Sequence, residues 1–164
     1  MSKLDRGKLN DTLAAMFSNI EYRSDYLFYA HMIGQCSIKI DETLPAPAGV
    51  AFSIDHYNLY INPKEFDKFK LVSRLAILKH EMFHILYGHL DRTEGRVHLP
   101  WNYATDCALN QHCNEEHLPD NCVNPKTLGE MLNCDECARG ESDRSSRLSS
   151  LSACLRRGGP PLQQ

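Results

Sequence analysis

Apolar residues near the start of the chain recur at the three-to-four spacing of a helix with one buried face. Over residues 8–20 they stand at Leu9, Leu13, Met16 and Ile20. A second helix is predicted over residues 24–36, because Ser24 can cap its first turn and Gly34 can end it. The first part of the chain is therefore predicted to be a pair of helices.

The spacing then shortens to alternation, which is typical of strands. Residues 37–42 predict one short strand, and residues 44–49 are a loop rich in proline. Residues 49–55 and 58–63 alternate again around a turn at residues 55–57, which predicts a hairpin closed by Pro63.

Helical spacing returns strongly over residues 71–90 and again over residues 101–113, where Pro100 suits the first helical turn. On a helical wheel with His80 at the origin, one group of apolar residues falls on the opposite side. These residues are Leu71, Leu75, Leu78, Met82, Ile85 and Leu86. The expected fold class is α+β, mainly helical, with a small sheet or hairpin before the helix that carries His80.

The character of the chain changes after residue 128. Residues 129–164 contain no Phe, Tyr or Trp and are rich in Ser, Arg and Gly. Such a segment buries too little apolar surface to offset its ordering entropy. We expect one domain over residues 1–128, followed by a disordered, low-complexity tail that a truncation or a frameshift would also explain.

Composition and charge narrow the environment and the partners. The formal charge is -3 and the basic residues are scattered, which argues against nucleic acid as a partner. No stretch has the length and apolar character of a membrane span or of a secretory signal. Seven cysteines, an odd number, do not form the paired framework of a small secreted domain. We expect a cytoplasmic protein without a membrane partner.

The run HEMFH at residues 80–84 is the most specific chemical signal in the chain. Its two histidines, His80 and His84, lie one helical turn apart and about 40° apart around the axis, so one Zn²⁺ can reach both imidazoles. Glu81 lies at the edge of the same face, where its carboxylate can accept a proton from an attacking water without being a ligand. The pattern predicts a catalytic zinc site.

A catalytic zinc needs a third protein ligand, and two residues compete for this position. His89 follows Gly88, so a helix that ended there could swing its imidazole back, whereas a continuing helix would leave it in the core. Asp106 is favoured, because it lies on the next strong helix, one turn before Asn110. Asn110 could then orient a ligand imidazole through its ring N–H.

These residues also carry a family resemblance. LYINP, KHEMFHILYGHL and WNYATDCALN, in that order, resemble the metallopeptidase domain found in front of von Willebrand factor A-like domains in bacterial and phage proteins. The resemblance covers roughly residues 8–128 and includes the turn LPDNCVNP. It implies a zincin-like fold, a zinc ion on His80 and His84, and Glu81 as the general base. Family members generally continue into the von Willebrand-like domain, where this chain has its Ser- and Arg-rich segment.

The leading hypothesis is zinc-dependent hydrolysis of a peptide or protein substrate, with Glu81 as general base. The hairpin would support the substrate, which would add as a strand near residues 59–61. A non-catalytic alternative is a binding or assembly module that the metal stabilises. A hydrolytic nuclease is less well supported. His89 comes one residue too early for the H-x3-H-x5-H spacing of some small RNA-maturation enzymes, and no basic groove is evident.

Overall fold

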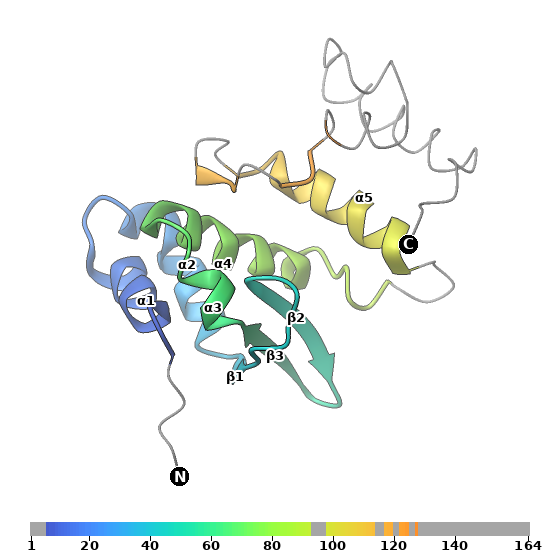
Figure 1. The fold of residues 1–164 in the computed structure, drawn as a ribbon, viewed down its shortest axis with the longest axis horizontal. Coiled ribbons are helices and arrows are strands. Elements are labelled where there is room, and N and C mark those ends of the chain that lie inside the picture. The colour runs from blue at the N-terminus through green and yellow to red at the C-terminus, as the bar shows by residue number, and fades with distance from the viewer. Residues whose placement is uncertain (1–5, 93–97, 114–116, 120–121, 125–126, 128–164) are drawn as a thin grey trace. The chain divides into compact units, whose positions relative to one another are not determined.

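The computed structural model describes residues 6–92, 98–113, 117–119, 122–124 and 127 (Figure 1). The chain divides into two compact units, Met1–Arg92 with Glu116–Pro119 and Thr93–Glu115 with Asp120–Gln164. The domain boundary predicted at residue 128 and the tail predicted beyond it lie outside the described residues. No helix within the described ranges is long and apolar enough to cross a membrane.

The first unit contains a three-stranded sheet with the strand order β1–β3–β2. Strand β1 spans Ser37–Ile40, β2 spans Ala48–Ser53 and β3 spans His56–Ile61. β3 is antiparallel to β2 and parallel to β1. Together with five helices among the described residues, this small sheet confirms the predicted α+β class.

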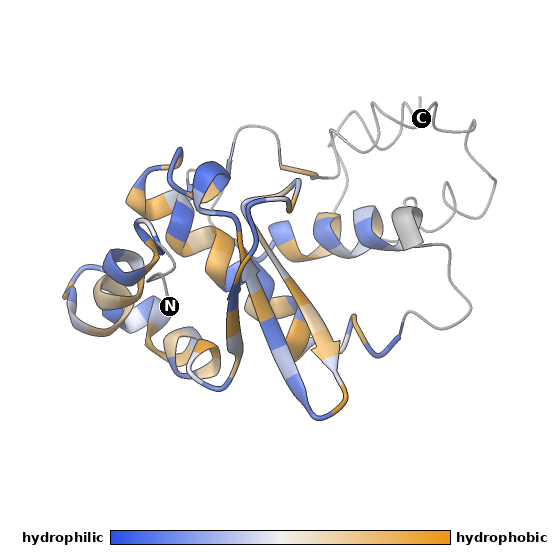
Figure 2. Ribbon diagram, turned by 60° about the horizontal axis from the view of Figure 1, so that its bottom comes forward, coloured by the Kyte–Doolittle hydropathy of each residue, from blue (hydrophilic) through white to orange (hydrophobic). Residues whose placement is uncertain are grey.

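The predicted hairpin is present, but its turn lies earlier than expected. Ile54 and Asp55 form the connection, while Tyr57 belongs to β3 and pairs with Phe52 across the hairpin. The two rings lie 5.0 Å apart between centroids, so this cross-strand contact extends the ladder to the turn. Ile54 is 97% exposed, and the tip of the hairpin is coloured hydrophobic in Figure 2.

The prediction that a substrate strand adds beside residues 59–61 is wrong. Leu59 pairs with Ile38 on one side and with Val50 on the other, so β3 is the central strand and its backbone groups are already used. Among the described strands only β1 and β2 have an open edge. β2 is also the strand that packs against α4, the helix that carries the two histidines.

Four helices complete the described part of the first unit. α1 spans Leu9–Ser18, α2 spans Arg23–Ile33, α3 spans Pro63–Phe66 and α4 spans Leu71–Leu86. Pro63 follows the sheet as expected, and it begins α3 behind an Asn62 cap whose side chain accepts a hydrogen bond from the Lys64 N–H at 3.0 Å.

Three sequence predictions about helix ends need correction. α1 ends at Ser18, so Ile20 leaves the apolar face and is 95% exposed. Ser24 does not cap α2, because the helix begins one residue earlier and the Ser24 hydroxyl donates to Asp25 instead. α4 ends at Leu86 rather than near residue 90, and Leu86 is itself exposed.

The core lies where α1, α2 and α4 meet one face of the sheet. Leu59 and Ile61 of β3 are fully buried in the same hydrophobic cluster as Leu75, Leu78 and Met82 of α4. Burying each of these large side chains contributes roughly 1.5–3 kcal/mol. α4 therefore has its apolar side fixed on the sheet and on the neighbouring helices.

Lys79 fastens α2 to α4 on another side of the same helix. Its Nζ lies 5.2 Å from the ring centroid of Tyr29, 5.5 Å from that of Tyr26 and 5.7 Å from that of Phe83. Tyr29 and Phe83 also meet edge to face at 5.4 Å. Cation–π and aromatic contacts of this kind restrict rotation of α4 about its axis.

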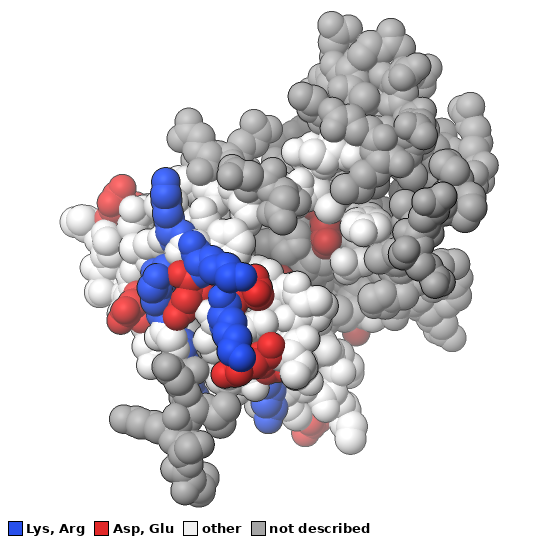
Figure 3. All heavy atoms as spheres, viewed as in Figure 1, with Lys and Arg blue, Asp and Glu red and all other residues white. Residues whose placement is uncertain are grey.

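Charged side chains of opposite sign are interleaved on the face of the first unit seen in Figure 3. Lys64 pairs with Glu42 at 2.6 Å, and Lys68 pairs with Glu65 at 2.7 Å. This face therefore offers no continuous basic surface for a phosphate backbone.

In the second unit the described helix is α5, His98–Asn110. It begins three residues before the predicted start, and Pro100 lies in its first turn as expected. α5 carries Asp106 and Asn110 one turn apart, so both side chains lie on one side of the helix.

A buried arginine links α4 to α1. Arg74 is 7% exposed and donates from Nε to the Thr12 hydroxyl at 2.9 Å and from Nη1 to the Phe69 carbonyl at 2.8 Å. Thr12 is fully buried, and its hydroxyl donates in turn to the Lys8 carbonyl at 2.8 Å. The threonine thus supplies the acceptor that a buried guanidinium nitrogen requires.

We predict that Thr12→Val lowers the free energy of unfolding by about 1–3 kcal/mol, because the valine keeps the shape but leaves the Arg74 Nε–H without its acceptor. Urea denaturation measures this loss. Adding Arg74→Met should recover part of it, whereas Ser18→Ala, at an exposed hydroxyl bonded to Ala14, should change stability by less than about 0.5 kcal/mol. Equal small effects of Thr12→Val and Ser18→Ala would contradict the prediction.

Candidate metal centre

His80 and His84 project from α4 with their imidazole rings next to one another. The ring centroids lie 4.8 Å apart with an interplanar angle of 67°, and the two Nε2 atoms lie 3.0 Å apart. His84 is buried at 7% exposure, whereas His80 is half-buried. Within the pair, His80 is therefore the ring that is partly exposed to solvent, and His84 is the ring that is buried in the protein.

The Nε2 pair has the spacing of two ligands of one metal ion. Two nitrogens at about 2.0–2.1 Å from a tetrahedral zinc lie roughly 3.3 Å from each other. The observed 3.0 Å is within a few tenths of an ångström of that value. Without a metal, two neutral imidazoles can approach this closely through an N–H···N hydrogen bond between the two Nε2 atoms. With a divalent cation between them, both Nε2 atoms would instead offer their lone pairs to the metal.

Glu81 follows His80 directly on α4 and is half-buried. Successive residues of a helix point about 100° apart, so its carboxylate leaves the axis beside the two imidazoles rather than between them. The Glu81 carboxylate therefore lies near the two histidines but does not point in their shared direction, as a third ligand on the same helix face would.

Among the described residues, His80 and His84 of the first unit and Asp106 of the second have the donor atoms that a metal ion would need, two imidazole nitrogens and one carboxylate oxygen. Two imidazoles and one carboxylate are a donor set typical of catalytic zinc, which leaves a fourth position for water or substrate. The donor chemistry therefore fits a divalent metal.

Within the second unit, Asp106 and Asn110 have defined neighbours. The Asn102 amide donates to Asp106 Oδ2 at 3.2 Å. Asn110 is 4% exposed, and its amide nitrogen donates to the Val123 carbonyl at 2.7 Å. The Asn110 amide thus holds the segment that follows α5.

Cys107, next to Asp106, is a buried neutral thiol. Burial, then the nearby charges of Asp106 and Cys122, raise the pKa of Cys107 to about 12. At neutral pH the group is therefore protonated and behaves as a small apolar residue rather than as a thiolate ligand.

His89 returns to the histidine pair, but on its other side. Its Nδ1 lies 3.4 Å from Nδ1 of His84, while Nε2 of His84 faces His80. The two nitrogens of an imidazole point in widely divergent directions, so a cation on Nε2 is out of reach of His89 in this arrangement. The chain does turn back at Gly88, and it places His89 beside Nδ1 of His84 rather than beside the Nε2 that faces His80.

The end of α4 explains how His89 gets there. Gly88 has a left-handed φ of 60°, its N–H donates to the Ile85 carbonyl at 3.0 Å, and the His89 N–H donates to the His84 carbonyl at 3.0 Å. These two bonds form a Schellman motif. The signal available in the sequence was the glycine just past the last strongly periodic residue.

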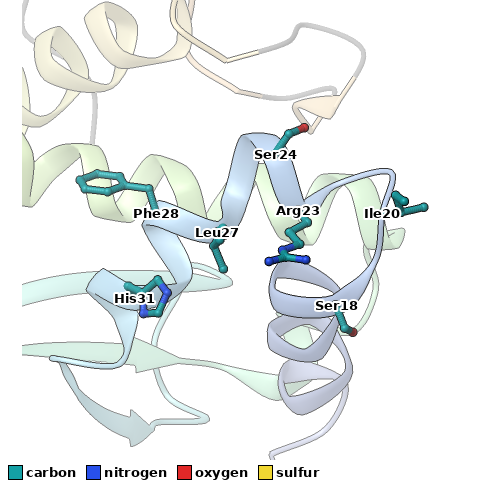
Figure 4. Close-up of a pocket in the computed structure, with 7 residues that line it drawn as sticks. All are labelled: Ser18, Ile20, Arg23, Ser24, Leu27, Phe28 and His31. Carbon is teal, nitrogen blue, oxygen red and sulfur yellow. The ribbon is translucent and has the colours of Figure 1, made fainter.

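A hollow of about 660 Å³ lies elsewhere, at the junction of α1 and α2 (Figure 4). Its lining includes Ile20, Arg23, Phe28 and His31. With one histidine and no carboxylate in its lining, it lacks the donors of a metal centre.

We predict that Gly88→Ala lowers the free energy of unfolding by about 1 kcal/mol, because an alanine must adopt the left-handed conformation there. A new Cβ would meet nothing closer than Asp91 at 3.8 Å, so the cost lies in the backbone. Thermal unfolding measures it. Gly88→Asn should cost less, and Gly49→Ala, at an ordinary strand position with room for a Cβ, should cost least. A neutral Gly88→Ala would speak against the motif.

Comparison with known proteins gives the family. A family model described as a putative metallopeptidase domain matches residues 28–149. This range includes the whole sheet, α4 with its HEMFH run and α5, and it extends past residue 128. No curated protein and no solved structure matches the chain. Because the match covers most of the 164 residues, the chain belongs to the family of putative metallopeptidase domains.

Proposed function

We propose that this protein is a zinc-dependent peptidase whose metal is held by His80, His84 and Asp106. The observation that carries the proposal is the pair of imidazole Nε2 atoms 3.0 Å apart, beside Glu81 on one helix. The family supports peptide-bond hydrolysis as the reaction, and the donor set of two imidazoles and a carboxylate supports zinc as the metal. A peptide or a protein is the corresponding substrate.

When bound, the zinc ion would supply Lewis-acid chemistry, which polarises a peptide carbonyl and makes water more acidic. Glu81 performs the proton transfers. Its carboxylate accepts a proton from the water that adds to the carbonyl carbon, and it delivers that proton to the amide nitrogen as the C–N bond breaks. The protein atoms are unchanged at the end, and the products, a carboxylate and a protonated amine, contain both hydrogens of the water.

Asn110 completes the proposal as an orienting residue. Its amide nitrogen is engaged with Val123, so the oxygen is the atom that would accept a hydrogen bond from the ring N–H of a ligand imidazole. Such a bond fixes the rotation of the ring and increases its basicity toward the metal.

Zinc binding should depend on His80, His84 and Asp106. We predict that His80→Ala and Asp106→Ala each weaken Zn²⁺ affinity by at least about 100-fold, more than the loss of an orienting residue causes. Competition with a chromophoric chelator measures the dissociation constants. Asp55→Ala, on the exposed hairpin turn, is the matched control and should bind zinc as the original protein does. An Asp106→Ala variant with unchanged affinity would exclude Asp106 as a ligand.

Catalysis should depend on Glu81 separately from zinc binding. We predict that Glu81→Gln keeps one equivalent of zinc but lowers kcat about 10²–10⁴-fold, because the amide cannot accept the proton. The assay follows cleavage of a mixed peptide library by mass spectrometry. Glu65→Gln, which removes an exposed carboxylate paired with Lys68, should retain full activity.

Zinc binding with no cleavage of any peptide, by the original protein and by Glu81→Gln alike, would instead favour the non-catalytic alternative. In that case the metal would join elements of the fold without opening a site for water.

A further inference from the structure

We propose that His89 is a positioning residue, which holds the His84 ring in the one orientation and tautomer that can bind the metal. This inference rests on the proposed metal site and adds a residue to it. The two ring nitrogens of His84 have different neighbours. Its Nε2 lies 3.0 Å from Nε2 of His80, and its Nδ1 lies 3.4 Å from Nδ1 of His89.

The His84–His89 contact is a buried polar pair. The two residues are 7% and 8% exposed, and their rings meet at 76° with centroids 5.3 Å apart. Buried ring nitrogens need hydrogen-bond partners, and these two nitrogens face each other. At 3.4 Å, the separation of the two Nδ1 atoms is longer than the usual 2.9–3.0 Å of a hydrogen bond from an N–H group.

The position of the protons gives this pair a role. A neutral imidazole has one nitrogen that donates and one that accepts. If the lone pair on His84 Nε2 is used for a cation, the proton must be on Nδ1, from which it can be donated to the lone pair of His89 Nδ1. His89 then has its own proton on Nε2. An acceptor at this place thus selects the tautomer of His84 that can be a ligand.

The backbone fixes His89 to the very residue that it supports. Its N–H donates to the His84 carbonyl at 3.0 Å, so main chain and side chain both connect these two residues. The Tyr87 ring stacks on the His89 ring, with centroids 5.9 Å apart and an angle of 24°. His89 is thereby held on one side by the helix end and on another by an aromatic ring.

The residue type is the strongest argument for a role beyond packing. In a Schellman motif the residue at the position of His89 commonly makes an apolar contact with the residue at the position of His84. Here both positions hold imidazoles, and burying them costs desolvation that a leucine would avoid. A purely structural helix end has no need of this pair.

The test compares metal affinity in two variants of the full-length chain. His89→Leu keeps an apolar helix-end contact but cannot accept a hydrogen bond, whereas His89→Asn offers an amide oxygen near the place of Nδ1. We expect His89→Leu to weaken Zn²⁺ and Co²⁺ binding roughly 10–100-fold and His89→Asn to recover most of this loss. His56→Leu, on the exposed hairpin, is the control and should leave metal affinity unchanged.

A second readout follows the proton itself. In the zinc-loaded protein, nitrogen-15 NMR should show the His84 proton on Nδ1, exchanging slowly with water, and His89→Leu should accelerate that exchange. Thermal unfolding of the metal-free variants should remain close to that of the original protein, which separates a positioning role from loss of the fold.

The outcomes distinguish this inference from the proposed function. Normal metal affinity in His89→Leu, or equal losses in the leucine and asparagine variants, would overturn the positioning role and leave the peptidase proposal intact. A metal-binding protein that shows the His89 effect but cuts no peptide would keep the inference and count against hydrolysis. Failure of the original chain to bind Zn²⁺ or Co²⁺ would overturn both.

Discussion

The packing of α4 against the sheet determines the rest of the first unit. Leu75, Leu78 and Met82 are all fully buried in the core cluster that includes Leu59 and Ile61 of β3, and three fully buried side chains along one helix fix its rotation as well as its position. The direction of every other side chain on α4 then follows from the helical period. His80 and His84 share a direction because their separation is one turn, and the core decides which direction this is.

Two further contacts keep this rotation from changing. Arg74 ties the beginning of α4 to α1 through Thr12, and Lys79 ties its middle to the aromatic residues of α2. The end of the helix is held by its own Schellman motif. A helix held at its beginning, middle and end favours the metal binding proposed for the histidine pair, since preorganised ligands lose little entropy on binding.

Much of this arrangement follows from local patterns in the sequence. The period of Leu75, Leu78 and Met82 predicts the buried side of α4, and alternation predicts the hairpin, because both patterns reflect burial on one face. The parallel pairing of β1 with β3 is not readable in this way, since it joins residues far apart in the chain. The peptide-strand position near residues 59–61 failed for the same reason: alternation reveals a strand, but not whether it is central or at an edge.

In the candidate site, too, the part that lies on one helix could be predicted from the sequence, and the part beyond the helix end could not. The spacing of His80 and His84 already implied neighbouring rings on one helix, because both belong to one periodic element. The position of His89 required the chain to leave the helix, and there the left-handed Gly88 sets the direction. Two alternatives were open for this histidine, a third ligand or a core residue, and the structure gives it a third place, against the opposite nitrogen of His84.

The two open edges of the sheet differ in their resistance to association. β1 is four residues long and has the exposed Lys39 near its middle, so a second copy of the same strand would meet a like charge. β2 is longer and contains no charged residue. Among the described strands, the edge without a charged residue is thus that of β2, and an edge without charge resists pairing with another strand less than a charged one does.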